Sequence, residues 1–161
     1  MSKTLIVYYS RTGNVKLLAQ KAAQLLSADV EELKDHSKWT GSMGFVRRFR
    51  RALIKGDITL SATTYDPKSY NKILVFTPNW GPALAPAVRT YLKQNIDSIP
   101  DLSLVVLGAF SDASGAKEEV AAMGYKLNNV LGLLDKGQTG KETGELQGEN
   151  LTKLQEFIKS I

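Results

Sequence analysis

The chain has 161 residues, of which 43% are hydrophobic and 23% are charged, and its net charge is +5. These values are ordinary for a globular protein of one domain, so we expect a single domain over residues 1–161. The sequence has no cysteine and one histidine, which excludes disulfides, thiol catalysis and metal sites built on cysteine or several histidines. The first apolar run, 5–9, is too short for a signal peptide or a membrane span, and we therefore expect a cytoplasmic protein.

Apolar runs that read as buried strands alternate along the chain with segments of helical periodicity. The expected strands are at 5–9, 28–33, 73–76, 102–107 and 130–134. The expected helices are at 15–26, 88–92, 120–127 and 151–161. Alternation of this kind favours right-handed crossovers and a parallel sheet with helices on both faces. We therefore expect an α/β fold: a three-layer, doubly wound, five-stranded parallel sheet in the order 2-1-3-4-5.

Ligands of such sheets bind beyond the carboxyl ends of the strands, where the winding reverses, and this selects the loops 10–15, 77–82 and 108–115. The first of these loops reads Ser-Arg-Thr-Gly-Asn-Val. It offers hydroxyl groups, a glycine that permits close approach, and the positive end of the next helix, all of which suit a phosphate. An N-cap followed by a tight turn would have a similar composition. The loop is neither a Walker A loop nor a G-x-G-x-x-G dinucleotide loop.

The same loop resembles the phosphate-binding loop of flavodoxins, Ser/Thr-x-Thr-Gly-Asn-Thr, with Val15 in place of the last threonine. The spacing of strands and helices is similar to that family over the whole chain. This resemblance implies a flavodoxin-like fold that binds one FMN non-covalently. It also implies that the FMN phosphate is held, through hydroxyls and backbone amides, by Ser10, Arg11, Thr12, Gly13, Asn14 and Val15. The Arg11 side chain either adds positive charge there or lies outside the site. Because Val15 has no hydroxyl, one hydrogen bond to the phosphate is expected to be missing.

The other two loops are expected to hold the flavin ring. Trp80 stands at the tip of the second loop, 77–82, and either stacks on a flat heteroaromatic ring or packs under the loop. The third loop, 108–115, is small and polar, with one large side chain, Phe110, and Ser114 would also serve as the N-cap of a following helix. By resemblance to flavodoxins, the ring contacts are expected from Thr77, Pro78, Asn79, Trp80, Gly81, Ala109, Phe110, Ser111, Asp112 and Gly115.

The positive charge of the chain is concentrated between His36 and Gly56, where six residues are basic and none is acidic. Apolar residues recur at helical spacing around Arg47–Arg51, which predicts a basic amphipathic helix. Such a helix is either a solvated surface or a docking site for an acidic redox partner, a pyridine-nucleotide phosphate or an anionic membrane surface. We expect no nucleic-acid binding, since no recognition motif or aromatic platform accompanies the arginines. We also expect no stable membrane insertion. The sequence makes no prediction of the oligomeric state.

Three functions are compatible with these residues, and no side chain is assigned a catalytic role because FMN would supply the chemistry. The favoured one is electron transfer through FMN to a redox partner. The second is an FMN-dependent oxidoreductase that takes hydride from NAD(P)H and passes it to a quinone or another small acceptor. The third is a non-redox interaction module with a degenerate flavin site, which Val15 favours and the intact Thr12-Gly13-Asn14 run and Trp80 oppose. Fold alone does not choose among them.

Overall fold

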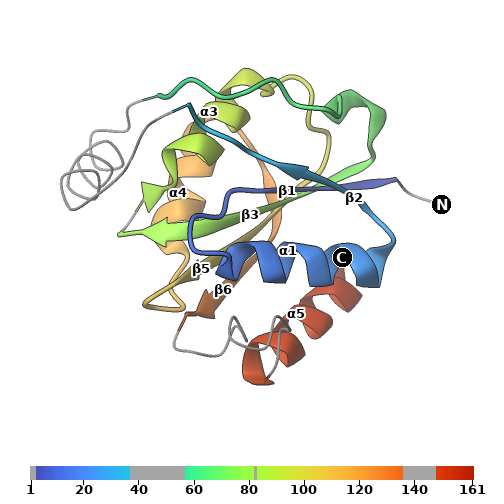
Figure 1. The fold of residues 1–161 in the computed structure, drawn as a ribbon, viewed down its shortest axis with the longest axis vertical. Coiled ribbons are helices and arrows are strands. Elements are labelled where there is room, and N and C mark those ends of the chain that lie inside the picture. Colours follow the sequence, from blue (N-terminus) through green and yellow to red (C-terminus); the bar gives the residue numbers. More distant parts are fainter. Residues whose placement is uncertain (1–2, 37–56, 82, 136–147) are drawn as a thin grey trace.

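The computed structural model of the protein describes residues 3–36, 57–81, 83–135 and 148–161. Its parallel strands are β1 (Thr4–Tyr8), β2 (Asp29–Glu32), β3 (Lys72–Trp80), β5 (Leu102–Gly108) and β6 (Leu127–Leu134). They form one sheet in the order β2-β1-β3-β5-β6, and a short strand, β4 (Ala83–Leu84), pairs with the end of β3 (Figure 1). Counted along the chain, the parallel strands have the order 2-1-3-4-5. The expected doubly wound α/β fold is therefore confirmed.

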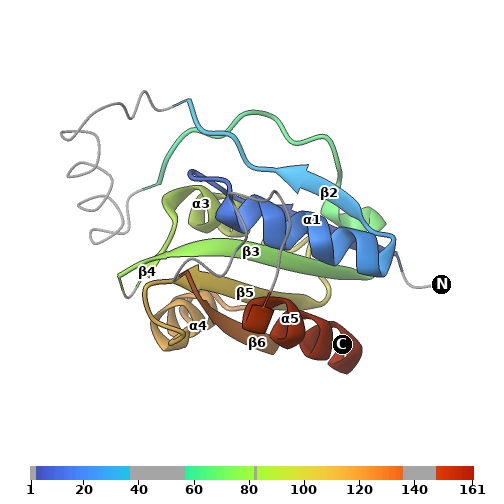
Figure 2. The same ribbon diagram turned by 60° about the horizontal axis from the view of Figure 1, so that its bottom comes forward.

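Helices cover both faces of this sheet (Figures 1 and 2). On one face lie α1 (Asn14–Leu26) and α5 (Gly148–Ser160). On the other face lie α3 (Pro86–Gln94) and α4 (Ser114–Ala122), and a 3-10 helix, η1 (Pro67–Ser69), precedes β3. Within the described residues, no helix is long and apolar enough to cross a membrane.

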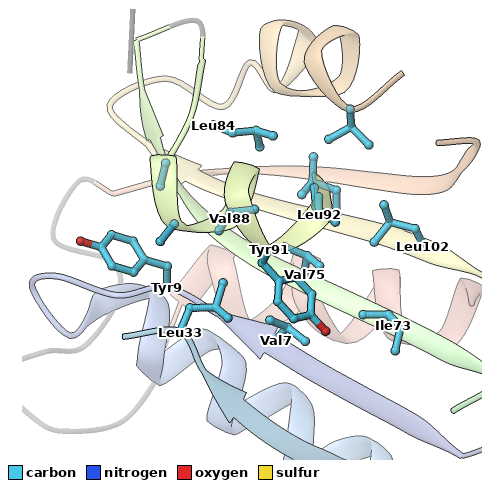
Figure 3. Close-up of a cluster of buried hydrophobic side chains, with 14 of the residues drawn as sticks. Val7, Tyr9, Leu33, Ile73, Val75, Leu84, Val88, Tyr91, Leu92 and Leu102 are labelled. Carbon is cyan, nitrogen blue, oxygen red and sulfur yellow. The ribbon is translucent and has the colours of Figure 1, made fainter. Parts of the chain in front are cut away.

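The core is divided by the sheet into two clusters, which is why the central strands are continuous apolar runs. On β1, Ile6 faces α1 and α5, whereas Leu5 and Val7 face the other side. Figure 3 shows the second cluster, in which Tyr91 and Leu92 of α3 pack over the sheet. All five side chains are at most 1% exposed, and burial of one such side chain contributes about 1.5–3 kcal/mol.

The second predicted loop is wrong as a loop, because β3 continues through Thr77, Pro78, Asn79 and Trp80. Pairing with β4 extends the strand: Asn79 is opposite Leu84, and Trp80 is opposite Ala83. Gly81 follows with a φ of 70°, in the left-handed region that a tight hairpin connection uses and that glycine adopts without strain. The segment 77–81 is therefore the end of a strand and the start of a hairpin.

The predicted helix at 120–127 is wrong at both ends. The helix begins earlier, at Ser114, and it ends at Ala122. Gly124 stops it, since a φ of 99° cannot continue a right-handed helix, and Leu127 already begins β6. The predicted basic helix around Arg47–Arg51 lies outside the described residues.

Candidate functional site

The loop between β1 and α1 leaves the start of a helix open to a ligand. Gly13 is the N-cap of α1 and has a φ of 95°, which favours glycine. Its N–H donates to Ser10 Oγ at 3.2 Å, so the loop folds back on itself. A methyl group placed on Gly13 would meet no atom within 4 Å. Because the first N–H groups of a helix have no partner within the helix, this terminus offers donors and partial positive charge to an anion.

Asn14, the first residue of α1, connects this loop to the end of β6. Its Nδ2 donates to Asp135 Oδ1 at 2.7 Å, and the Asp135 N–H donates to the Gly108 carbonyl at 2.7 Å. The other amide atom, Asn14 Oδ1, is buried and accepts no hydrogen bond from the described residues. An unsatisfied buried acceptor costs about 1–3 kcal/mol, so a ligand that donates a hydrogen bond at this position would be favoured.

The remaining side chains of the first loop point to solvent or to the core. Arg11 and Thr12 are exposed at the tip. Val15 is 4% exposed and packs in the core cluster on the α1 and α5 side of the sheet. Val15 therefore has only its backbone amide to offer to a ligand in this loop.

The β3–β4 hairpin carries Trp80 to the neighbouring strand end. The Trp80 ring lies edge to face with Tyr9, which directly precedes the first loop, and the ring centroids are 6.1 Å apart. Trp80 is half-buried and packs against the core cluster that contains Tyr9. The indole thus packs against the core, as expected if Trp80 packs under its loop, while part of it is still accessible for stacking on a flat ring.

A cavity of about 620 Å³ opens between this hairpin and the start of α4. Six of its lining residues were predicted from the sequence: Asn79, Gly81, Ala109, Phe110, Asp112 and Gly115. The other two lining residues, Ser114 and Glu118, were not among the residues predicted to contact a ligand. The signal was present, because residues four apart lie on the same face of a helix. At the rim of the cavity the Phe110 side chain is 75% exposed, unusually high for a large apolar group.

The other predicted ring contacts do not line this cavity. Thr77 is 1% exposed, and its hydroxyl donates to the Pro78 carbonyl at 3.0 Å. Pro78 and Trp80 lie on β3 beside the cavity rather than among its lining residues. Ser111 lines a separate hollow between its own loop, β6 and α5. The structure therefore brings together the hairpin tip and most of the third loop.

Close backbone packing fixes the third loop relative to the hairpin. Asn79 Nδ2 donates to the Asp112 carbonyl at 3.2 Å. A Cβ atom on Gly108 would lie 2.6 Å from Asn79 Cβ, and a Cβ atom on Gly132 would lie 1.8 Å from the Ser111 carbonyl oxygen. Both glycines permit approaches that no other residue allows, so the walls of the cavity are formed in advance of any ligand.

Asp112 gives the cavity a fixed negative charge. It accepts hydrogen bonds from the Ser114 N–H at 2.8 Å and from the Ser114 hydroxyl at 3.0 Å. These two bonds hold the pKa of the Asp112 carboxyl below its ordinary value, because they stabilise the ionised form. The prediction of Ser114 as N-cap is wrong: Ala113 occupies that position, and the Asp112 carboxylate satisfies the first amide of α4.

Solved structures share this architecture along nearly their whole length. A Lactobacillus acidophilus flavoprotein in complex with FMN is 24% identical, with a TM-score of 0.69 over 89% of this chain and 99% of that one. A Bacteroides eggerthii protein is 13% identical, with a TM-score of 0.75 over 100% and 98%. A Fusobacterium nucleatum flavodoxin bound to flavin mononucleotide is 11% identical, with a TM-score of 0.57 over 99% and 96%. The chain has a flavodoxin-like fold.

No protein-family model and no curated protein matches the sequence. In a flavodoxin-like fold the winding reverses between the first and third strands, and this switch point is the usual ligand site. Here β1 and β3 are adjacent, and where β1 ends the Tyr9 N–H donates to the Phe76 carbonyl of β3 at 3.2 Å. The first loop and the hairpin therefore leave the sheet side by side at the switch point.

Proposed function

We propose that the protein binds one FMN non-covalently and transfers electrons through it to and from a redox partner. The observation that carries the proposal is the pairing of two features at one edge of a flavodoxin-like sheet. One is the open terminus of α1 at Gly13, and the other is the preformed cavity between the hairpin and α4. FMN has a matching pair of parts, a terminal phosphate and a flat ring. The FMN in the L. acidophilus flavoprotein and in the F. nucleatum flavodoxin adds support.

The residues of the first loop fit a phosphate on a hydroxylated chain. The Ser10 and Thr12 hydroxyls and the N–H groups at the start of α1 are donors suited to phosphate oxygens. The buried Asn14 Oδ1 requires a hydrogen-bond donor, and an ionised phosphate oxygen cannot donate to it. A hydroxyl of the ribityl chain can. The orphaned acceptor thus supports a ligand that carries hydroxyl groups beside its phosphate.

The cavity fits a flat heteroaromatic ring with polar edges. Gly81 and Ala109 leave room for close approach of the ring, and Phe110 offers it an apolar face. FMN, when bound, supplies the redox chemistry, and the protein supplies position and electrostatics. With Phe110 exposed at the rim, an edge of the ring would be accessible to a partner protein, which supports electron transfer.

An FMN-dependent NAD(P)H oxidoreductase is the second candidate. The observation that favours it is that the cavity, about 620 Å³, opens at a rim where Phe110 is exposed, so that a small molecule could reach a ring bound inside it. In that case a quinone or another small acceptor would reach the ring through the same opening. The partner prediction for the basic segment around Arg47–Arg51 applies to either candidate and stays a prediction.

The test begins with flavin titrations of the apoprotein and then separates the candidates by anaerobic reduction. We expect FMN to bind about tenfold more tightly than riboflavin or better, since riboflavin lacks the phosphate. Dithionite should reduce the bound flavin, and NADPH should not. Rapid reduction by NADPH would favour the oxidoreductase, and absence of binding by either flavin would leave the non-redox module.

A further inference from the structure

A buried ion pair joins α3 to α4. Arg89 is 0% exposed and Glu119 is 4% exposed. The Arg89 Nε donates to Glu119 Oε1. Two charges removed from water are expensive, and a buried pair is by itself weak evidence of stabilisation. The electrostatic attraction between Arg89 and Glu119 therefore does not by itself explain the pair, and we consider what else the two side chains contact.

That role involves the backbone of Leu84 in β4. The Leu84 N–H donates to Glu119 Oε2 at 3.0 Å, and Arg89 Nη2 donates to the Leu84 carbonyl at 3.1 Å. In the described sheet β4 pairs with β3 alone, so its outer edge has no neighbouring strand. The two charged side chains hydrogen-bond the N–H and the carbonyl of Leu84 on that edge, in place of the backbone of an adjacent strand. Figure 3 shows Leu84 beside Val88 and Leu92 of α3, the helix that carries Arg89.

The elements joined in this way carry the two walls of the cavity. Asn79 and Gly81 belong to the hairpin wall, and Leu84 is paired with Asn79 across the hairpin. Glu118 lines the opposite wall on α4, and Glu119 is the next residue of the same helix. A change in the bonds between Glu119 and Leu84 would therefore move one wall relative to the other.

We propose that Arg89 and Glu119 are positioning residues that set the separation of these walls and so control how tightly the ring of the flavin is held. The inference rests on the proposed function, in which the ring occupies the cavity. The phosphate loop should be insensitive to the pair, because it leads into α1, which packs on the opposite face of the sheet. Loss of the pair should therefore weaken the ring contribution to binding and leave the phosphate contribution intact.

The test compares Glu119→Gln with wild type in titrations of FMN and riboflavin and in the visible circular dichroism of the bound flavin. Glutamine keeps the size of the side chain and one acceptor oxygen but removes the charge opposite Arg89. We expect the affinity for both flavins to fall about tenfold, with an unchanged ratio between them and an altered dichroism spectrum. Arg89→Lys, which keeps the charge but loses the planar fork, should change both readouts in the same direction.

Glu31→Gln is the matched control. Glu31 is also a buried carboxylate, 7% exposed, and it accepts backbone hydrogen bonds from Thr64 at 2.6 Å and Tyr65 at 3.0 Å. It lies on β2 and does not line the cavity. We expect this control to lower the melting temperature and to leave flavin affinity and dichroism unchanged.

The results distinguish failure of the positioning role from failure of the proposed function. If wild type binds riboflavin and the Glu119 and Arg89 variants bind it equally well with the same dichroism, the positioning role is overturned and the proposed function stands. If Glu31→Gln reduces affinity as much as Glu119→Gln does, the pair acts only through general stability and the role is again overturned. If wild type binds neither flavin, the proposed function fails and the inference fails with it. Should Glu119→Gln not fold, Arg89→Lys provides the same comparison.

Discussion

Tyr9 and Trp80 meet edge to face, with ring centroids 6.1 Å apart and ring planes at 76°. Tyr9 is the last residue before the first loop, and Trp80 is the last residue of β3. The Tyr9 hydroxyl donates to Asp35 Oδ2 at 3.2 Å, which fixes the orientation of the phenol ring. The contact therefore sets the orientation of the indole relative to the phosphate loop before any ligand binds.

This geometry leads to a prediction for Trp80 fluorescence. The sequence has two tryptophans, so a Trp39→Phe variant leaves Trp80 as the sole indole emitter. We expect FMN to quench that emission, because a flavin ring stacked on the accessible part of Trp80 would be in direct contact with the indole. Tyr9→Leu should weaken flavin binding by about 0.5–1.5 kcal/mol, the usual contribution of an aromatic pair, as measured by the same titration. Emission that stays constant at saturating FMN would contradict the stacking role.

Thr12 tests the phosphate loop. Thr12→Val removes an exposed hydroxyl at the loop tip and should weaken FMN binding by about 1–3 kcal/mol, the cost of a lost bond to a charged group. Riboflavin affinity should not change, since riboflavin has no phosphate. Thr63→Val, an exposed threonine far from this loop in sequence, is the control and should affect neither ligand. An equal loss for both flavins would show that Thr12 does not contact the phosphate.

The strand order could be predicted because the alternation of strands and helices is visible in local patterns and a doubly wound sheet then has few possible orders, and the first and third loops could be placed at the strand ends in the same way. Runs such as Leu5 to Tyr9 are buried on both faces of the sheet, and their composition indicates this directly. The extension of β3 through Trp80 could not be predicted in the same way. It depends on β4, a strand of two residues whose outer edge is satisfied by Glu119, 35 positions away from Leu84. No local pattern encodes that contact.

The same distinction applies to the candidate site. Gly13 was recognisable because a tight turn that lets a ligand approach the backbone favours glycine, and Phe110 because a large apolar side chain is unusual in a small polar loop. The bond between Asn14 and Asp135 joins residues 121 positions apart, and the orphaned Asn14 oxygen follows from that arrangement. The inward orientation of Val15 follows from helix packing rather than from its place in the motif.

Gly132 tests how rigidly the third loop is held. Alanine at this position would place its Cβ 1.8 Å from the Ser111 carbonyl oxygen, which is backbone and cannot rotate away. We expect Gly132→Ala to destabilise the protein by about 1–3 kcal/mol in urea denaturation, as overpacking usually does. Gly13→Ala is the comparison, since it meets no atom within 4 Å and should cost about 1–2 kcal/mol through its positive φ alone. A fully stable Gly132→Ala variant with unaltered flavin affinity would contradict the tight packing.

Asp112 leads to a pH prediction. The Ser114 N–H and hydroxyl hold the pKa of the Asp112 carboxyl below its ordinary value. A carboxyl group with a lowered pKa in the folded state favours folding above its unfolded pKa, and that contribution is lost as the pH falls through the lower folded pKa. Because Asp112 is exposed, its titration is a better readout than stability. We expect carbon-13 NMR of the folded protein to give a midpoint below that of an aspartate in an unfolded peptide.

The Ser114→Ala variant isolates the hydroxyl part of this effect. It removes the donor at 3.0 Å and keeps the N–H at 2.8 Å, so the pKa of Asp112 should rise only part of the way toward its ordinary value. Ser111→Ala is the control in the same loop and should leave the Asp112 midpoint where it is. If Ser114→Ala does not raise the midpoint, the hydroxyl bond is not formed in solution.

Since Asp112 is ionised throughout neutral pH, flavin affinity measured between about pH 6 and pH 8 should not depend on its titration. A change of affinity in that interval would have to come from another group.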